Sequence, residues 1–270
     1  MAVALVTGGS SGIGLAVVRR LAAAGDQVFA ASRNPQRAPL PEGVTPIAFD
    51  LADPRAADTT VTSVVRAAGR LDVLINNAGT GTLGPLEETD DDEAHRILEV
   101  NLFGPMRLAR AAVPVMRSQG GGRIVNVTSM NDVLPAPFAG WYSASKAALA
   151  SASVVLDAEI HGFGIFVTVI APGLFRTDMI EGLVSFGIAE GSAYRKTLEG
   201  LRAENTAYVA GAGNPEEVAD AIDQCIRADD PPARVVVGED AEKWVKLVHD
   251  TDPDSFAKLL RAEVATLTGP

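Results

Sequence analysis

The chain has 270 residues, a formal net charge of −11 and one cysteine, Cys225. This length suits one large α/β domain or two small ones, and a lone cysteine excludes an internal disulfide. The acidic balance argues against general nucleic-acid binding. We identify neither an apolar run of about eighteen residues nor a secretory leader. We therefore expect a cytoplasmic protein that does not enter a membrane.

Apolar segments rich in β-branched residues alternate with segments of helical spacing along most of the chain. Strands are predicted, in chain order, at residues 3–8, 27–32, 44–50, 71–79, 122–129, 165–173 and 233–238. Helices are predicted between them at residues 14–25, 53–69, 90–119 and 141–160, with a kink at Pro114 in the third. Such alternation forms right-handed βαβ units. We therefore predict an α/β fold: a doubly wound, Rossmann-type parallel sheet of about seven strands with helices on both faces.

The alternation is interrupted near the end of the chain. Residues 178–210 have the spacing of one or two helices and are predicted to form an insertion between the sixth and seventh strands. Residues 240–270 carry two further helical runs, which we expect to pack on an edge of the domain or on a partner subunit. Since no repeat or low-complexity linker divides the chain, residues 1–270 are predicted to form one domain.

The stretch TGGSSGIG at residues 7–14 follows the first predicted strand and opens the first predicted helix. Glycines here let the backbone turn tightly and approach a ligand, and the helix N-terminus offers N–H groups to an anion. The pattern favours a site for the pyrophosphate of a dinucleotide, although any tight turn between a strand and a helix can also use glycine. The candidate binding residues are Gly8, Ser10, Ser11, Gly12, Ile13 and Gly14.

Three side chains suited to proton chemistry follow later in the chain. Tyr142 and Lys146 are four residues apart on a predicted helix and therefore share a face. A lysine ammonium lowers the pKa of a neighbouring phenol, which would make the pair a proton-transfer couple. Ser129 ends the fifth strand, at the edge where such sheets bind ligands, and its hydroxyl can bond a carbonyl. The alternative interpretation is structural: polar residues at the edge of an amphipathic helix, and a strand-end serine that bonds the backbone.

Two segments, VFAASRN at 28–34 and NNAGTGTLGPLEE at 76–88, resemble the hydroxysteroid-dehydrogenase-like branch of the short-chain dehydrogenase/reductase family, and four motifs together resemble this family in its single-domain form. The four motifs are TGGSSGIG at 7–14, NNAG at 76–79, Ser129 with YSASK at 142–146, and APG at 171–173, spread across most of residues 1–240. The resemblance implies hydride transfer between a nicotinamide cofactor and a ketone or secondary alcohol. It implies that Ser129 orients the substrate and that Tyr142 donates or accepts the proton. It further implies that Lys146 tunes Tyr142 and holds the cofactor ribose, and that Asn101 supports a proton relay through water.

The same resemblance assigns the cofactor-binding positions. These are Asp50 and Leu51 at the adenine, Asn77, Ala78 and Gly79 along the adenosine, Pro172 and Gly173 beneath the nicotinamide, Thr177 at its carboxamide, and Tyr142 and Lys146. Ser32 stands where an acidic residue would bond the 2′-hydroxyl of NAD, and Arg33 and Arg37 follow it. A guanidinium fits a phosphate, so we expect NADP(H) rather than NAD(H). The alternative is that these arginines are solvated loop residues, and Ser11 leaves the glycine turn without a basic residue.

The loop after Ser129 departs from the family, which often has glycine three positions later, where this chain has Asp132. That loop borders the expected substrate. The candidate wall residues are Met130, Leu134, Phe138, Leu174, Phe175, Met179 and Phe186, with Trp141 beside them. Such a lining suits a bulky, largely apolar carbonyl compound, although several of these side chains can instead pack in the core. The three histidines are scattered, so no metal site is expected.

Two other functions share this fold and these motifs. One is a non-catalytic protein that binds the nucleotide as a sensor or a scaffold, and the other is a redox-neutral biosynthetic step. The complete set of proton-transfer residues favours an NADP(H)-dependent oxidoreductase, because a sensor does not need a proton donor. The resemblance also implies a homodimer or homotetramer formed through the long helices, with a small carbonyl or alcohol substrate and neither a nucleic-acid nor a membrane partner.

Overall fold

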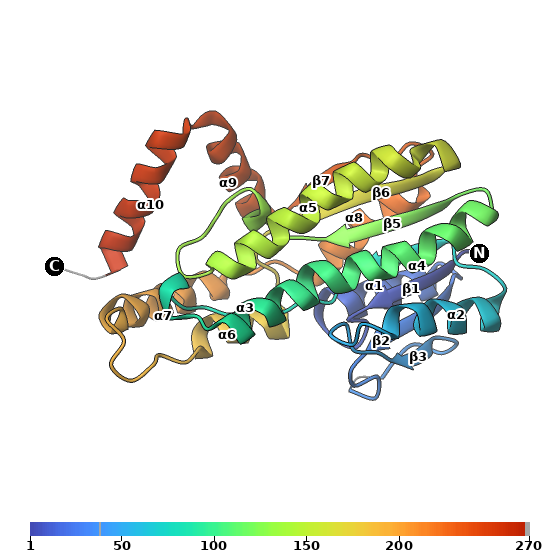
Figure 1. Ribbon diagram of the computed structural model, residues 1–270, viewed down its shortest axis with the longest axis horizontal. Helices are drawn as coiled ribbons and strands as arrows, with labels where there is room; N and C mark the ends of the chain where they lie inside the picture. Colours follow the sequence, from blue (N-terminus) through green and yellow to red (C-terminus); the bar gives the residue numbers. More distant parts are fainter. Residues whose placement is uncertain (38, 268–270) are drawn as a thin grey trace.

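The structure, a computed structural model, describes residues 1–37 and 39–267. Over these residues the chain forms a parallel sheet of seven strands in the order β3-β2-β1-β4-β5-β6-β7 (Figure 1). The strands are β1 Val3–Thr7, β2 Gln27–Ser32, β3 Thr45–Ala48, β4 Val73–Asn76, β5 Gly122–Val127, β6 Ile165–Pro172 and β7 Arg234–Val237. The predicted doubly wound α/β fold with about seven strands is therefore confirmed.

Helices cover both faces of this sheet. In the described residues they are α1 Gly12–Ala23, α2 Ala56–Ala68, α3 Asp91–Leu98, α4 Gly104–Ser118, α5 Gly140–Ile160, α6 Asp178–Ser185, α7 Arg195–Ala210, α8 Pro215–Arg227, α9 Glu239–Asp250 and α10 Pro253–Leu267. Successive strand residues point to opposite sides, so Val3 and Leu5 of β1 join one core with α2 and α4. Ala4 and Val6 join the other core with α1 and α8. None of the helices in the described ranges is both long and apolar enough to cross a membrane.

The long helical stretch predicted at residues 90–119 is divided in the structure. α3 ends at Leu98, a π-helical segment, η2, spans Glu99–Phe103, and α4 begins at Gly104. Pro114, where we predicted a kink, lies inside α4, and the change of helical geometry comes before it. A single π turn inside a helix often marks a functional site. Here it contains Asn101, one of the predicted catalytic residues, which is completely buried.

The predicted insertion and tail are both helical. Residues 178–210 contain α6 and α7, and residues 240–267 contain most of α9 and all of α10, while residues 268–270 of the predicted tail lie outside the described residues. The two tail helices lead away from β7, and α10 returns to α7 (Figure 1). Gly200 of α7 faces the backbone of Leu267 so closely that a Cβ would overlap its carbonyl oxygen. The tail therefore packs on the insertion.

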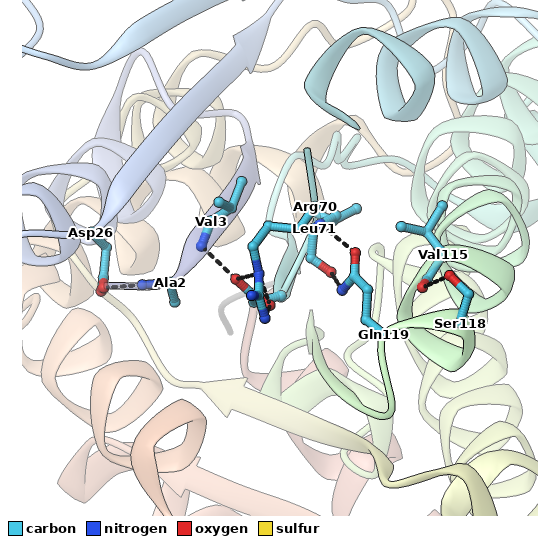
Figure 2. A network of polar contacts seen from close by, with 9 residues as sticks. Ala2, Val3, Asp26, Arg70, Leu71, Val115, Ser118 and Gln119 are labelled. Atoms are coloured by element: carbon cyan, nitrogen blue, oxygen red, sulfur yellow. Dashed lines mark hydrogen bonds and ion pairs between the residues drawn. The ribbon is translucent and has the colours of Figure 1, made fainter. Parts of the chain in front are cut away.

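Polar contacts tie the beginnings of the strands together (Figure 2). The Asp72 carboxylate accepts the Val3 N–H at 2.8 Å and is bonded by the Arg70 guanidinium at 2.6 to 2.9 Å. Leu71 and Gln119 exchange two hydrogen bonds of 3.0 Å between backbone and side-chain amide. These contacts lie at the amino ends of β1 and β4. Their polar groups serve the fold, whereas the carboxyl ends of the same strands border the site.

Candidate active site

A cavity of about 1220 Å³ lies at the carboxyl ends of the strands, where the strand order reverses between β1 and β4. Ligands of doubly wound sheets bind at this place. The predicted site residues that line it are Gly8, Ser10, Ser11, Gly12, Ile13, Ser32, Arg33, Asp50, Leu51, Asn77, Ala78, Gly79, Ser129, Met130, Leu134, Tyr142, Lys146, Pro172, Gly173, Leu174, Phe175, Thr177, Met179 and Phe186. Predicted cofactor, catalytic and substrate residues thus meet in one cavity. Within the described ranges, no group of three His, Cys, Asp or Glu side chains is placed to hold a metal ion.

The glycine turn forms a close-fitting cradle at one end of this cavity. Gly8, with a φ of +69°, and Gly12, with a φ of +50°, adopt left-handed conformations that other residues rarely take. A Cβ on Gly14 would overlap the carbonyl oxygen of Gly8 and would come within 2.6 Å of Nδ2 of Asn77. Among the described contacts, the Ser11 side chain makes no capping bond to α1. The first N–H groups of α1 are therefore left for an anion.

The end of β2 supplies polar groups beside this cradle. The Oγ atom of Ser32 is buried and has no hydrogen-bond partner among the described residues. An unpaired buried hydroxyl costs roughly 1–3 kcal/mol, so the atom suits a polar group of a ligand. Arg33 lines the cavity next to it, and Arg37 forms an ion pair of 2.8 Å with Asp178 at the start of α6. The glycine cradle and the unpaired Ser32 hydroxyl together fit a dinucleotide.

Asn101 holds the chain after β4 against α5. Its Nδ2 donates to the carbonyl oxygen of Thr80 at 2.8 Å and to the hydroxyl of Ser145 at 2.9 Å, while its Oδ1 accepts the Thr80 N–H at 2.8 Å. A Cβ on Gly79 would lie 3.3 Å from both Asn101 Oδ1 and Lys146 Nζ. Asn101 is not part of the described lining of the cavity, and its amide is used to fix the loop that lies beside Lys146.

Tyr142 and Lys146 share a face of α5, with Nζ 5.8 Å from the centroid of the phenol ring. Burial raises the pKa of Tyr142, the hydrogen bond with Ser129 opposes that rise, and the charge of Asp132 adds to it. The expectation that the Tyr142 pKa is lowered is therefore wrong for this structure. The Lys146 ammonium donates to the carbonyl oxygen of Val127 at 3.0 Å, and burial leaves a phenolate poorly solvated. Tyr142 consequently keeps its proton at neutral pH.

Burial lowers the pKa of Lys146 to about 8, with the charge of Asp132 acting in the opposite direction. Below pH 8 the folded chain therefore bears the cost of a buried ammonium. As the pH rises from about 8 to the ordinary lysine pKa of 10.5, Lys146 loses its proton in the folded chain before it does so in the unfolded chain. The stability of the fold therefore rises over this range.

Lys146→Met is consequently expected to raise the free energy of unfolding at pH 7 by up to about 3 kcal/mol, with the gain shrinking toward pH 10. Denaturant unfolding at both pH values measures this, with Lys243→Met at an exposed position as the control. A gain that does not change between the two pH values would contradict the expectation.

Two of the predicted wall residues have other surroundings. Phe175 touches the cavity, but it is only 3% exposed and packs in the second core, against the backbone of Gly213 and Gly238. Phe138 lies outside the described lining of the cavity, as does the neighbouring Trp141. The backbone of Phe138 has a φ of +64°. Its ring packs edge-on against the ring of Tyr194, with the two centroids 6.0 Å apart. Both phenylalanines therefore serve mainly to hold the loops around the cavity.

The insertion and the tail add wall residues that the sequence motifs did not indicate. They are Leu183 of α6, Leu201, Glu204, Asn205 and Tyr208 of α7, Trp244 of α9, and Leu260 and Glu263 of α10. The only signal for them in the sequence is the helical spacing of these segments. Because helices from both segments border one cavity, they define its far end together.

A parallel doubly wound sheet, a glycine cradle at its reversal point, and a serine, a tyrosine and a lysine at the same edge define a nucleotide-dependent oxidoreductase of the Rossmann type. A family model described as short chain dehydrogenase matches residues 2–186. The chain belongs to the short-chain dehydrogenase family. The matched residues end after α6, so α7, α8, α9 and α10 lie beyond the family model.

Curated relatives match most of the chain. Oxidoreductase BOA17 of Botryotinia fuckeliana is 32% identical over 247 residues, which cover 88% of this chain and 89% of the relative. The 3-ketodihydrosphingosine reductase of Bacteroides thetaiotaomicron is 31% identical over 239 residues, which cover 87% of each chain. Both matches extend past the family model, so the likeness includes part of the region that follows α6.

Solved structures share the fold over nearly the whole chain. A short-chain dehydrogenase from Streptomyces avermitilis is 33% identical, with a TM-score of 0.81 and coverage of 100% of this chain and 98% of its own. A metagenomic short-chain oxidoreductase solved with NADP is 28% identical, with a TM-score of 0.69 and coverage of 87% and 96%. A short-chain dehydrogenase/reductase from Burkholderia phymatum solved with NAD is 23% identical, with a TM-score of 0.80 and coverage of 93% and 97%. Structures of this shape therefore include complexes with either nucleotide.

Proposed function

We propose that this chain is an NADP(H)-dependent oxidoreductase that interconverts a ketone and a secondary alcohol, with Tyr142 as the proton donor and acceptor. The observation that carries this proposal is the meeting of Ser129, Tyr142 and Lys146 in one cavity with the glycine cradle. A phenol that keeps its proton at neutral pH is suited to act as an acid, so reduction of the ketone is the favoured direction.

Each side chain has a distinct part in the proposed reduction. When bound, the nicotinamide supplies the hydride that adds to the carbonyl carbon. The Ser129 hydroxyl bonds the carbonyl oxygen and holds it toward Tyr142. The Tyr142 phenol gives its proton to that oxygen, which completes the alcohol. The Lys146 ammonium stabilises the phenolate that remains and bonds the cofactor ribose, and Asn101 fixes the loop beside Lys146. Oxidation of an alcohol follows the same steps in reverse.

We propose NADP(H) as the cofactor on the basis of Arg33 beside the unpaired Ser32 hydroxyl. Arg33→Ala is expected to raise the Kd for NADPH about 10- to 100-fold, because a charge-assisted bond from a guanidinium contributes roughly 1.5–3 kcal/mol. The Kd for NADH should stay the same. Titrations with both nucleotides at one salt concentration measure this, with Arg19→Ala at an exposed position outside the cavity as the control. Equal losses for both nucleotides would show that Arg33 does not read the 2′-phosphate.

We propose a bulky, largely apolar carbonyl compound as the substrate. Support comes from the apolar side chains in the lining of the cavity, among them Leu134, Met179, Leu183, Phe186 and Trp244. In a cavity of this kind, the apolar walls bind the apolar part of a substrate, and a few polar groups fix the orientation of the substrate. One relative is a 3-ketodihydrosphingosine reductase by name, which accords with reduction of a ketone.

The first experiment is a binding titration with NADPH and NADH, followed by a panel of apolar ketones of increasing size. Consumption of NADPH with an equal amount of alcohol formed supports the proposal. Tight nucleotide binding without turnover of any ketone would instead indicate a nucleotide-binding protein. A product formed without net consumption of the cofactor would indicate a redox-neutral step. Failure to bind either nucleotide would overturn the whole proposal.

Assembly and location are also proposals. We propose a homodimer or homotetramer, supported by exposed apolar side chains on the long helical stretches: Val154 is 56% exposed, Val155 54% and Phe103 49%. Association would bury such a surface. Light scattering should give a mass of two or four chains for the wild type and a smaller mass for Val155→Glu, and a monomeric wild type would contradict this. A cytoplasmic location accords with the free, buried Cys225.

A further inference from the structure

The loop after Ser129 contains a buried ion pair outside the predicted catalytic set. Asp132 ends the short helix η3, Met130–Asp132, and its side chain is 0% exposed. Its carboxylate oxygens accept bonds of 2.8 and 2.6 Å from the two terminal nitrogens of Arg234, a bidentate arrangement. The hydroxyl of Thr128 also donates to this carboxylate, at 2.7 Å. The pair occupies the position at which this chain departs from the glycine frequent in its family.

The ion pair fastens the serine turn to the far edge of the sheet. Arg234 begins β7 and lies opposite Val169 of β6 in the sheet register. At the other end of the turn, the Asp132 N–H donates to the carbonyl oxygen of Ser129 at 3.0 Å. The Ser129 hydroxyl accepts the Asn131 N–H at 3.2 Å. The turn that begins with the predicted catalytic serine is therefore held at its last residue by the end strand of the sheet.

Stability alone gives a weak reason for such a pair. A buried carboxylate loses its hydration, and an ion pair of good geometry often does no more than offset that cost. The same chain has a comparable pair at the amino ends of β1 and β2, where Arg227 bonds Asp26 at 2.8 Å and the Asp26 side chain is 3% exposed. That pair lies outside the lining of the cavity. A substitution in the Arg227–Asp26 pair therefore tests stability without changing the site.

The charge of Asp132 also reaches the proton-transfer residues of α5. The groups that face it are the Arg234 guanidinium from β7, the Thr128 hydroxyl after β5, and Tyr142 and Lys146 of α5. Its negative charge raises the pKa of Tyr142 and the pKa of Lys146. Both directions favour the protonated forms that ketone reduction needs.

We propose that Asp132 is a positioning residue for Ser129, held by Arg234 so that the serine hydroxyl stays beside Tyr142 at the cavity. The inference rests on the proposed function, because it gives Asp132 a part in the same proton transfer. Asp132 is not in the described lining of the cavity. It therefore acts through the turn that it closes and through its charge.

The kinetic test compares Asp132→Asn with Arg234→Lys and with the control Arg227→Lys. Asp132→Asn keeps the size of the side chain and removes its charge. It is expected to lower kcat for ketone reduction about 10- to 100-fold, the loss that a misplacement of about 1 Å causes, without changing the Kd for NADPH. The alkaline limb of its pH–rate profile should shift to lower pH. The reason is that the negative charge of Asp132, which raises the pKa of Lys146, is removed. Arg234→Lys should keep more activity, and Arg227→Lys should keep all of it.

Hydrogen–deuterium exchange supplies a readout that needs no substrate. Asp132→Asn should speed amide exchange at residues 129–134 and leave residues 7–14 unchanged. If the wild type reduces no ketone while exchange behaves in this way, the proposed function fails and the positioning of the turn stands. Unchanged exchange at residues 129–134, or a wild-type kcat in Asp132→Asn, overturns the inference. If Asp132→Asn does not fold, Arg234→Met carries the same expectations and the same refutation.

Discussion

Tyr142→Phe is expected to lower kcat for ketone reduction by about 10²- to 10⁴-fold, the usual contribution of a general acid, while the Kd for NADPH stays unchanged. The ring that borders the cavity remains, and only the hydroxyl that bonds Ser129 is removed. The loss should therefore appear in kcat and not in nucleotide binding. Steady-state kinetics with the best ketone of the panel, together with a nucleotide titration, measure both quantities.

Tyr194→Phe is the matched control for this substitution. The Tyr194 hydroxyl bonds the Glu87 carboxylate at 2.6 Å, and the residue lies outside the described lining of the cavity. Its loss should leave kcat unchanged. If Tyr142→Phe keeps activity within a few-fold of the wild type, Tyr142 is not the proton donor. A non-catalytic protein that binds the nucleotide would then be the better hypothesis.

The direction of the Tyr142 pKa shift decides how the two reaction directions should depend on pH. Reduction needs a phenol and oxidation needs a phenolate, and burial disfavours the phenolate in this structure. Alcohol oxidation should therefore need a more alkaline medium than ketone reduction. Nothing in the spacing of Tyr142 and Lys146 reveals this, because four residues on a helix fix a shared face but not the exclusion of water from it.

The fold and the cradle follow from local patterns, and for that reason the sequence predicts them well. Strands buried on both faces must be apolar at successive positions, as Val3–Thr7 is, and a turn that approaches a phosphate must lack side chains, as at Gly8 and Gly14. The order of the motifs along the chain then brings Ser129 and Tyr142 to the same sheet edge.

Contacts between distant segments account for what the sequence did not predict. Asp132 and Arg234 are separated by 102 residues, and no local sequence pattern around either residue predicts that they pair. Leu260 reaches the cavity because α10 folds back onto α7 at Gly200, which no periodicity indicates. The π turn at Asn101 is likewise hidden, since a helical pattern looks the same with one additional residue per turn.

Gly14→Ala is expected to weaken NADPH binding about 10- to 100-fold and to lower the free energy of unfolding. The added Cβ would overlap the carbonyl oxygen of Gly8 and crowd the amide of Asn77. A backbone carbonyl cannot rotate away as a side chain does, so α1 must shift and the cradle must open. Overpacking of this kind costs about 1–3 kcal/mol of folding stability. If binding must restore the closed cradle, the same cost lowers the affinity by up to about a hundredfold. The better helix propensity of alanine, worth roughly 0.5–1 kcal/mol, offsets only part of it.

Gly162→Ala is the control, because a Cβ there meets no heavy atom within 4 Å and the backbone does not need a positive φ. It should leave nucleotide binding unchanged. Calorimetric titration with NADPH and thermal unfolding of both variants measure the two effects separately. If Gly14→Ala binds NADPH as tightly as the wild type, then the close packing of α1 on Gly8 does not shape the nucleotide site. If it loses stability but keeps its affinity, the glycine serves only the fold, and the pyrophosphate must be bound by other groups of the cavity.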